Sequence, residues 1–241
     1  MMISNNKLIL SGVLLFIVMF ADAQLPHDFW GRHAPGITDS IPIYSDEKIL
    51  YLTLDACDRR FDRSVISLLR KNNISATLFL TARWIDANPV AFKDLAADNL
   101  FKIANHGTRH KPASISGMSA YNIKGTTSRE ELIAEINDTA NKIEALTGVC
   151  PDWYRSGTAW YDAGAIEIIT NELGLKIAGF AKDLDAGASF SAKQIYRTAL
   201  TARPGDILLT HMNRPESEIT AGLAHALPEL IRRGFVFKQL P

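Results

Sequence analysis

Acidic and histidine side chains recur where predicted strands give way to helices. Asp55 and Asp58 follow the first predicted strand, His106 and His110 follow the third, and His211 lies at the end of the sixth. Two imidazoles and a carboxylate on one face can hold a divalent metal and leave positions open for water and substrate. The residue types and their spacing therefore suit a metal-assisted hydrolytic site.

Each of these residues alone also has a purely structural interpretation. Asp55 could cap a helix or form a turn. His106 and His110, with Gly107 between them, lie on a predicted loop and could be a surface pair. His211 has apolar neighbours, so by default it would be a hydrogen-bonded core histidine.

The common placement of these residues favours function. Arg155 closes another predicted strand, and Asp183 and Asp185 follow the next. In parallel α/β folds the carboxyl ends of the strands share one face, where active sites are built. Asp55 and His211, 156 positions apart, would then meet in one cleft. We expect these residues to form one active site rather than to have separate structural roles.

The elements that must position these residues follow an alternating pattern from residue 49 onward. Strands are predicted at 49–54, 76–81, 101–105, 152–156, 176–181, 207–212 and 235–239. Helices are predicted at 63–71, 89–98, 128–146, 162–173, 192–202 and 216–233, with Ser128 and Glu131 in the spacing of a capping box. This alternation predicts an α/β fold with a mostly parallel sheet, either doubly wound or closed as a barrel.

Composition excludes several classes of protein. The 241 residues carry 26 Lys+Arg and 26 Asp+Glu, and 47 % are hydrophobic, which excludes a disordered or collagen-like chain. A net charge of zero argues against nucleic acid as a partner, because phosphate binding needs a surplus of basic residues.

The N-terminus predicts export. Lys7 precedes an uncharged stretch over residues 8–20, and Ala21-Asp22-Ala23 has the form of a signal-peptidase site. We expect a signal peptide at 1–23, an extended N-terminal arm at 24–44 and one domain at 45–241. The protein would be secreted or periplasmic, and it would touch a membrane only through an uncleaved signal segment.

The two cysteines, Cys57 and Cys150, leave two interpretations open. An exported protein can form a disulfide, but two free buried thiols fit equally well. Their spacing does not suit a redox motif or a zinc knuckle.

In order and placement, these residues resemble the NodB-type polysaccharide deacetylases, carbohydrate esterase family 4, over residues 49–240. That family carries Thr-Phe-Asp-Asp, His-Ser/Thr-x-x-His, Arg-x-Pro, an Asp-containing motif and Leu-x-His. The counterparts in this chain are Thr53-Leu54-Asp55-Ala56, His106-Gly107-Thr108-Arg109-His110, Arg155-Ser156-Gly157, Asp185 and Leu209-Thr210-His211.

The resemblance implies a distorted (β/α) barrel of about seven parallel strands that removes N-acetyl groups from a glycan of the peptidoglycan or chitin type. It also implies a divalent metal, usually zinc. In that family's pattern Asp55 is the catalytic base, His211 is the general acid, and His106 and His110 bind the metal. Arg155 and Asp185 match the pair that positions the catalytic groups.

The chain departs from the family at several positions. Ala56 stands where the family has its third metal ligand, so Asp58 or Asp55 is expected to replace it, unless two histidines and water suffice. Gly157 stands in place of the proline of the third motif. An inactive carbohydrate-binding relative, or a hydrolase of another amide or imide C–N bond, is the alternative.

Two aromatic residues are candidates for substrate binding. Trp160 and Tyr161 follow the third motif and could stack on a sugar ring, or they could pack at the rim of the fold.

Overall fold

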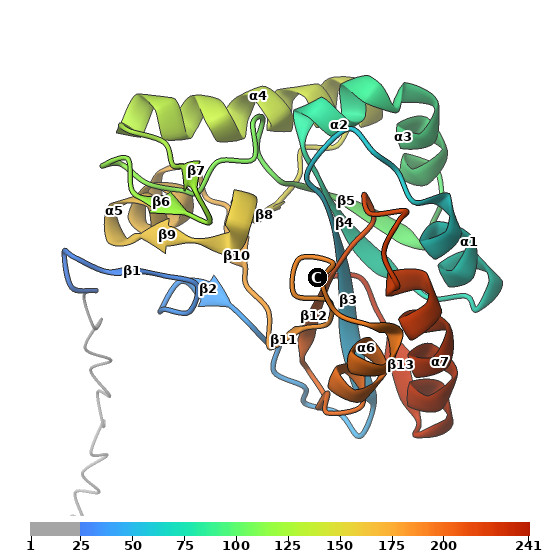
Figure 1. Cartoon of the computed structure of the whole chain (residues 1–241). Coiled ribbons are helices and arrows are strands. Elements are labelled where there is room, and N and C mark those ends of the chain that lie inside the picture. Colours follow the sequence, from blue (N-terminus) through green and yellow to red (C-terminus); the bar gives the residue numbers. More distant parts are fainter. Residues whose placement is uncertain (1–24) are drawn as a thin grey trace, which may run out of the picture.

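A curled parallel sheet forms the centre of the protein, and helices cover its outer face in the computed structural model (Figure 1). The structure describes residues 25–241, so the predicted signal peptide lies outside the described residues. The main sheet has the order β11-β12-β3-β4-β5-β8-β10-β2, and β13 also pairs with β3. Its strands are β2 (Ile37–Thr38), β3 (Lys48–Ala56), β4 (Ala76–Leu80), β5 (Phe101–Asn105), β8 (Trp153–Tyr154), β10 (Lys176–Ala178), β11 (Lys182–Asp183), β12 (Ile207–His211) and β13 (Phe235–Phe237).

All pairings in this sheet are parallel, and the sheet curls into a half-barrel. The prediction of an α/β fold built as a distorted barrel is therefore confirmed. Two small antiparallel pairs complete the strands, β1 (Trp30–Gly31) with β9 (Tyr161–Asp162) and β6 (Ser119–Ala120) with β7 (Ile123–Lys124).

The helices match the predicted pattern with two differences. They are α1 (Arg63–Lys71), α2 (Ala82–Ala87), α3 (Pro89–Ala96), α4 (Arg129–Thr147), α5 (Ala163–Glu167), α6 (Ala192–Ala199) and α7 (Ile219–Arg232). The short helix α2 was not predicted. The segment predicted as one helix at 162–173 divides into α5 and a π-helical turn at Ile168–Glu172. No helix within residues 25–241 is both long and apolar enough to cross a membrane.

The two faces of β3 have different tasks. Leu50, Leu52 and Leu54 pack with α1 and α7 in the core on the outer face of the sheet. Because successive strand residues point to opposite faces, Thr53 and Asp55 face the inside of the half-barrel. Both of them contact buried Arg155 there. The strand thus supplies the core with one face and the site with the other.

Helix α4 begins at the predicted cap, but the capping pattern is different. The Ser128 hydroxyl accepts a hydrogen bond from the Glu131 backbone N–H at 3.2 Å, as expected. The Glu131 carboxylate accepts one from the backbone N–H of Thr127, not from that of Ser128. The helix ends at Gly148, whose φ of 75° is the left-handed conformation typical of this position.

The N-terminal segment closes the gap between β10 and β12. β2 pairs with β10, and the next residues run beside the start of β12 through a bridge between Ser40 and Asp206. Asp39 joins both sides, because its carboxylate accepts a hydrogen bond from Phe180 N and its carbonyl accepts one from Ile207 N.

Leu54→Ala should lower the free energy of unfolding by about 2–5 kcal/mol, because it opens a cavity in a core that is otherwise filled. The matched control is Leu146→Ala at the end of α4, where the leucine is 49 % exposed and the expected change stays within about 0.5 kcal/mol. Urea unfolding measures both changes. Equal losses in the two variants would contradict the assignment of β3 to the core.

Candidate active site

The carboxyl ends of β3, β5, β8 and β12 bring the predicted residues together. A cavity of about 520 Å³ opens there, and its lining includes Asp55, Cys57, His110 and His211. Residues up to 156 positions apart thus face one space, as the strand-end argument predicted.

Arg155 is fully buried and holds Asp55. Its guanidinium donates to the Asp55 carboxylate at 2.7 Å and to Thr53 Oγ1 at 3.0 Å. It also donates to the carbonyls of Ala178 and Gly179. Burial alone would raise the pKa of the Asp55 carboxyl, but the cations around it, Arg155 first, lower it overall. Asp55 is therefore a carboxylate at neutral pH.

His211 is paired with Asp185 at the opposite side of the cavity. Its Nδ1 donates to Asp185 at 2.9 Å, and the same carboxylate accepts from the His211 backbone N–H and from the Thr210 hydroxyl. Burial alone would lower the pKa of His211, but the charge and hydrogen bond of Asp185 raise it well above the ordinary value. The imidazole is therefore protonated at neutral pH, and Nε2 is the nitrogen left for a substrate.

His106 and His110 follow β5 and lie edge to face, with ring centroids 4.9 Å apart. The His106 Nδ1 lies 2.8 Å from the carbonyl oxygen of Arg155. A carbonyl can only accept, so Nδ1 carries a proton and Nε2 is the nitrogen left to bind a metal. This hydrogen bond fixes the ring in the way that partners of metal-binding histidines do.

Gly157 explains one departure from the family pattern. A Cβ at this position would lie 2.2 Å from the carbonyl carbon of His110, a distance that the backbone does not tolerate. His110 itself has a φ of 62°, in the left-handed region that non-glycine residues rarely adopt. Glycine at 157 thus leaves room for the turn that carries His110.

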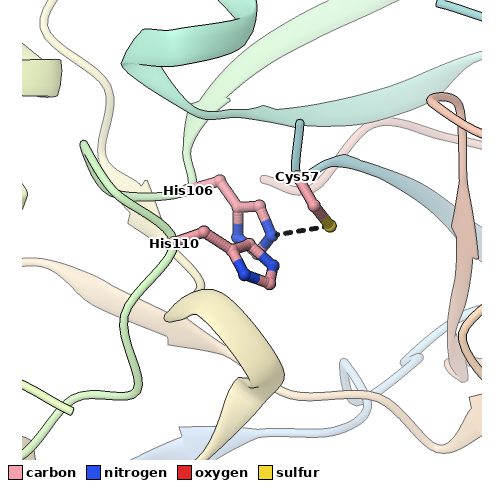
Figure 2. A group of neighbouring side chains, drawn as sticks. All are labelled: Cys57, His106 and His110. Atoms are coloured by element: carbon pink, nitrogen blue, oxygen red, sulfur yellow. Dashed lines mark hydrogen bonds between the residues drawn. The ribbon is translucent and has the colours of Figure 1, made fainter. Parts of the chain in front are cut away.

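Cys57, not Asp58, lies beside these two histidines (Figure 2). Donor atoms of Cys57, His106 and His110 all lie within 4.8 Å of one another, and the Cys57 Sγ is 3.6 Å from His106 Nε2. Sulfur and imidazole nitrogen are ligands that divalent transition metals accept, so this group is a possible metal site.

Asp58 points to other partners. Its carboxylate accepts hydrogen bonds from Arg60 at 2.8 Å and from Arg214 at 3.1 Å. The prediction placed Asp58 among the metal ligands because it lies two residues after Ala56, with Asp55 as the alternative. The alternation of β3, continued by one residue, puts residues 53, 55 and 57 on one face and was the signal that could have identified Cys57.

The two cysteines do not form a disulfide. Both are free, Cys57 is buried and Cys150 is exposed. Burial alone would raise the pKa of the Cys57 thiol, but the imidazoles around it, His110 first, lower it well below its usual range.

The two aromatic candidates have structural partners. Tyr161 is fully buried, and its hydroxyl accepts a hydrogen bond from the backbone N–H of Ser156, so its ring has no exposed face for a sugar. Trp160 packs against Trp30 of the N-terminal arm, with ring centroids 5.4 Å apart. Arg32, which the prediction missed, lines the cavity with its guanidinium 5.4 Å from the ring of Phe180.

Residues 44–178, more than half of the chain, match the family described as polysaccharide deacetylase. The chain belongs to the polysaccharide deacetylase family. A peptidoglycan-N-acetylglucosamine deacetylase of Bacillus cereus is 26 % identical over 219 residues, which cover 83 % of this chain and 89 % of that relative. The family is one of hydrolases that act on N-acetyl amide bonds and depend on a metal.

Solved structures share the fold of this polysaccharide deacetylase. A peptidoglycan N-acetylglucosamine deacetylase superposes with a TM-score of 0.72 at 22 % identity, covering 86 % of this chain and 91 % of its own. A pseudoenzyme of carbohydrate esterase family 4 from Bacillus anthracis superposes with a TM-score of 0.66 at 20 % identity, and the match covers 81 % of this chain and 64 % of that one. The fold therefore occurs in both active and inactive relatives.

Asp185→Asn should lower the pKa of His211, because it removes the carboxylate that raises this pKa and leaves the burial that lowers it. NMR titration of the imidazole in the metal-free protein measures the change. A group whose pKa is higher in the folded protein than in the unfolded chain stabilises the fold at pH values below the unfolded-state pKa. This contribution is lost as the pH rises through the folded-state pKa. The variant should therefore lose stability mainly on the acidic side.

Asp183→Asn is the control for this measurement. The Asp183 carboxylate accepts hydrogen bonds from the backbone N–H groups of Asp185 and Ala186, so its loss should shift the His211 pKa much less. Equal shifts in the two variants would show that the Asp185 contact is not the cause.

Proposed function

We propose that this protein hydrolyses N-acetyl groups from a glycan of the peptidoglycan or chitin type. One observation carries the proposal. An ionised carboxylate, Asp55, and a protonated imidazole, His211, line one cavity beside two histidines and a cysteine that fit a metal. Amide hydrolysis needs a base and an acid in this arrangement.

The two groups divide the proton transfers. Asp55 accepts the proton of the attacking water as the water oxygen forms its bond to the acetyl carbonyl carbon. His211 donates a proton to the sugar nitrogen as the C–N bond breaks, and this releases acetate and a free amine. Arg155 keeps Asp55 ionised and oriented, and Asp185 does the same for protonated His211.

A divalent metal, which we propose is zinc, would be held by His106 and His110. When bound, it supplies Lewis-acid activation of the water and of the acetyl carbonyl. The donor chemistry supports this ion, because imidazole nitrogen is a preferred zinc ligand.

The choice of substrate rests on two supports. The Bacillus cereus relative is named for peptidoglycan N-acetylglucosamine. The net charge of zero suits an uncharged sugar chain better than a polyanion, and it argues against nucleic acid as a partner.

Asp55→Asn should reduce acetate release by roughly 100-fold or more, the usual contribution of a general base. The assay incubates the purified protein with N-acetylglucosamine oligomers and with peptidoglycan, after chelation and after zinc is restored. Chelation should abolish release and zinc should restore it.

The matched control is Asp152→Asn. The Asp152 carboxylate pairs with Lys102 and Lys176 just before β8, at the other end of the strands. It should retain activity. A folded wild-type protein that releases no acetate with any added metal would overturn the proposed function.

We also propose that the protein is exported. Lys7, the uncharged stretch at 8–20 and Ala21-Asp22-Ala23 support a cleaved signal peptide. The N-terminal sequence of the protein recovered from the periplasm or medium should begin at Gln24. Recovery of the intact N-terminus in the cytoplasm would contradict export.

A further inference from the structure

Cys57 lies where a third metal ligand is needed. We propose that its thiolate is that ligand, which makes the site a Cys-His-His centre selective for Zn²⁺ and other thiophilic divalent ions over Mg²⁺ and Mn²⁺. The inference deepens the proposed function, since it concerns the same site, but it can be tested without substrate.

The position of Cys57 follows from β3. The outward face of the strand ends at Ala56, which packs with Leu52 and Leu54 in the outer core. An additional residue brings the chain back to the inner face, so Cys57 lines the cavity with Asp55. Ala56, which replaces the family's acid, is thus apolar and turned away from the site. Its neighbour Cys57 supplies the donor atom.

The backbone around Cys57 is held in place. The carbonyl of Ala56 accepts from the Thr81 hydroxyl at 3.0 Å, and the carbonyl of Cys57 accepts from Arg83 at 3.0 Å. The thiol therefore projects from a fixed turn. A ligand that is already positioned loses less conformational entropy when a metal binds.

The neighbouring nitrogen faces the Cys57 sulfur. Because His106 Nδ1 is engaged by the Arg155 carbonyl, Nε2 is the nitrogen that points to the cavity side, 3.6 Å from the Cys57 sulfur (Figure 2). Ligands of one zinc ion, with bonds of about 2.0–2.3 Å, lie roughly 3–4 Å apart. The observed separation meets that requirement.

The acids on either side of Cys57 in the sequence already have other roles. Asp58 forms ion pairs with Arg60 and Arg214, and both pairs would have to break if it turned to the histidines. Asp55 pairs with Arg155 through Oδ1 and lies 3.5 Å from His106 Nε2 through Oδ2, so binding a metal there would compete with its proposed role as the base. Cys57 has neither an ion pair to break nor a proton transfer to perform.

The donor set decides which metal binds. Thiolate and imidazole are soft and borderline ligands, which favour zinc, whereas Mg²⁺ and Mn²⁺ favour carboxylate and water. Supplying the third ligand from Cys57 instead of an acid at position 56 therefore changes metal selectivity while it keeps a single negative ligand. The Cys-His-His set otherwise resembles zinc sites that leave a fourth position open.

Cobalt provides a direct readout of the sulfur ligand. Metal-free protein loaded with Co²⁺ should show the ultraviolet sulfur-to-cobalt charge-transfer band. Cys57→Ser should lose the band, and its zinc affinity should fall by at least about 100-fold, the upper end of what the loss of a residue that only hydrogen-bonds to a metal ligand costs. Cys57→Asp should lose the band but still bind metal, with its preference shifted toward Mn²⁺.

Two controls isolate Cys57. Cys150→Ser removes the exposed cysteine, and Asp58→Asn removes the nearby acid, so both should keep the band and the zinc content. Thermal unfolding of the metal-free proteins checks that Cys57→Ser still folds, and Cys57→Asp tests the same position with a ligand of another class.

The outcomes separate the two proposals. A band that survives in Cys57→Ser, or zinc that is lost in Asp58→Asn, overturns the thiolate ligand even if acetate is released. Acetate release that needs Cys57 but no metal also overturns it, since Cys57 would then act as a nucleophile. A cobalt band that depends on Cys57, without acetate release on any glycan, leaves the ligand standing and removes the proposed function.

Discussion

A cation without access to water has to be neutralised and hydrogen-bonded by the protein around it, and Arg155 meets this requirement with groups from three parts of the sheet. Its guanidinium binds Asp55 and Thr53 on β3 and the carbonyls that end β10, and it lies 4.3 Å from the centre of the Phe79 ring on β4. The backbone of the same residue orients His106. The ionisation of Asp55 and the orientation of the His106 ring thus depend on one buried residue, through its side chain and its backbone respectively.

The charges of the site are arranged as neutral pairs. Asp55 with Arg155, and Asp185 with His211, each place a buried carboxylate against a cationic side chain within hydrogen-bond distance. Such pairs keep Asp55 and His211 charged in a place where burial alone would favour their neutral forms. A chain whose acidic and basic residues balance overall thus places these two buried pairs at one end of the strands.

The sequence predicted the long elements and the strand ends well, because periodicity and apolar runs report which face is buried. Strand β5 and helix α1 have the predicted bounds, and Asp55, His110 and His211 share a cavity as expected. Short pairings such as β1 with β9 could not be predicted, because a two-residue strand is too short to show an alternating hydrophobic pattern and its partner is distant in the sequence. Tyr161 illustrates the same limit, because tertiary packing alone decides whether an aromatic ring is core or surface. Cys57 was missed because the predicted export suggested a disulfide first, although the alternation of β3 placed it on the same face as Asp55.

The closure of the half-barrel by Asp39 has a consequence for how the chain folds. Its contacts with Phe180 and Ile207 join residues 141 and 168 positions apart, and loop-closure entropy makes such distant contacts slow to form. The contacts of Asp39 that join β10 to β12, which we call the seam, can form only after nearly the whole sheet exists. Until then the outer edge of β10 and the start of β12, which β11 does not cover, lack their partner and can capture a strand of another molecule. The seam is therefore the place where a chaperone or a misassembled neighbour would compete with the protein's own N-terminal arm.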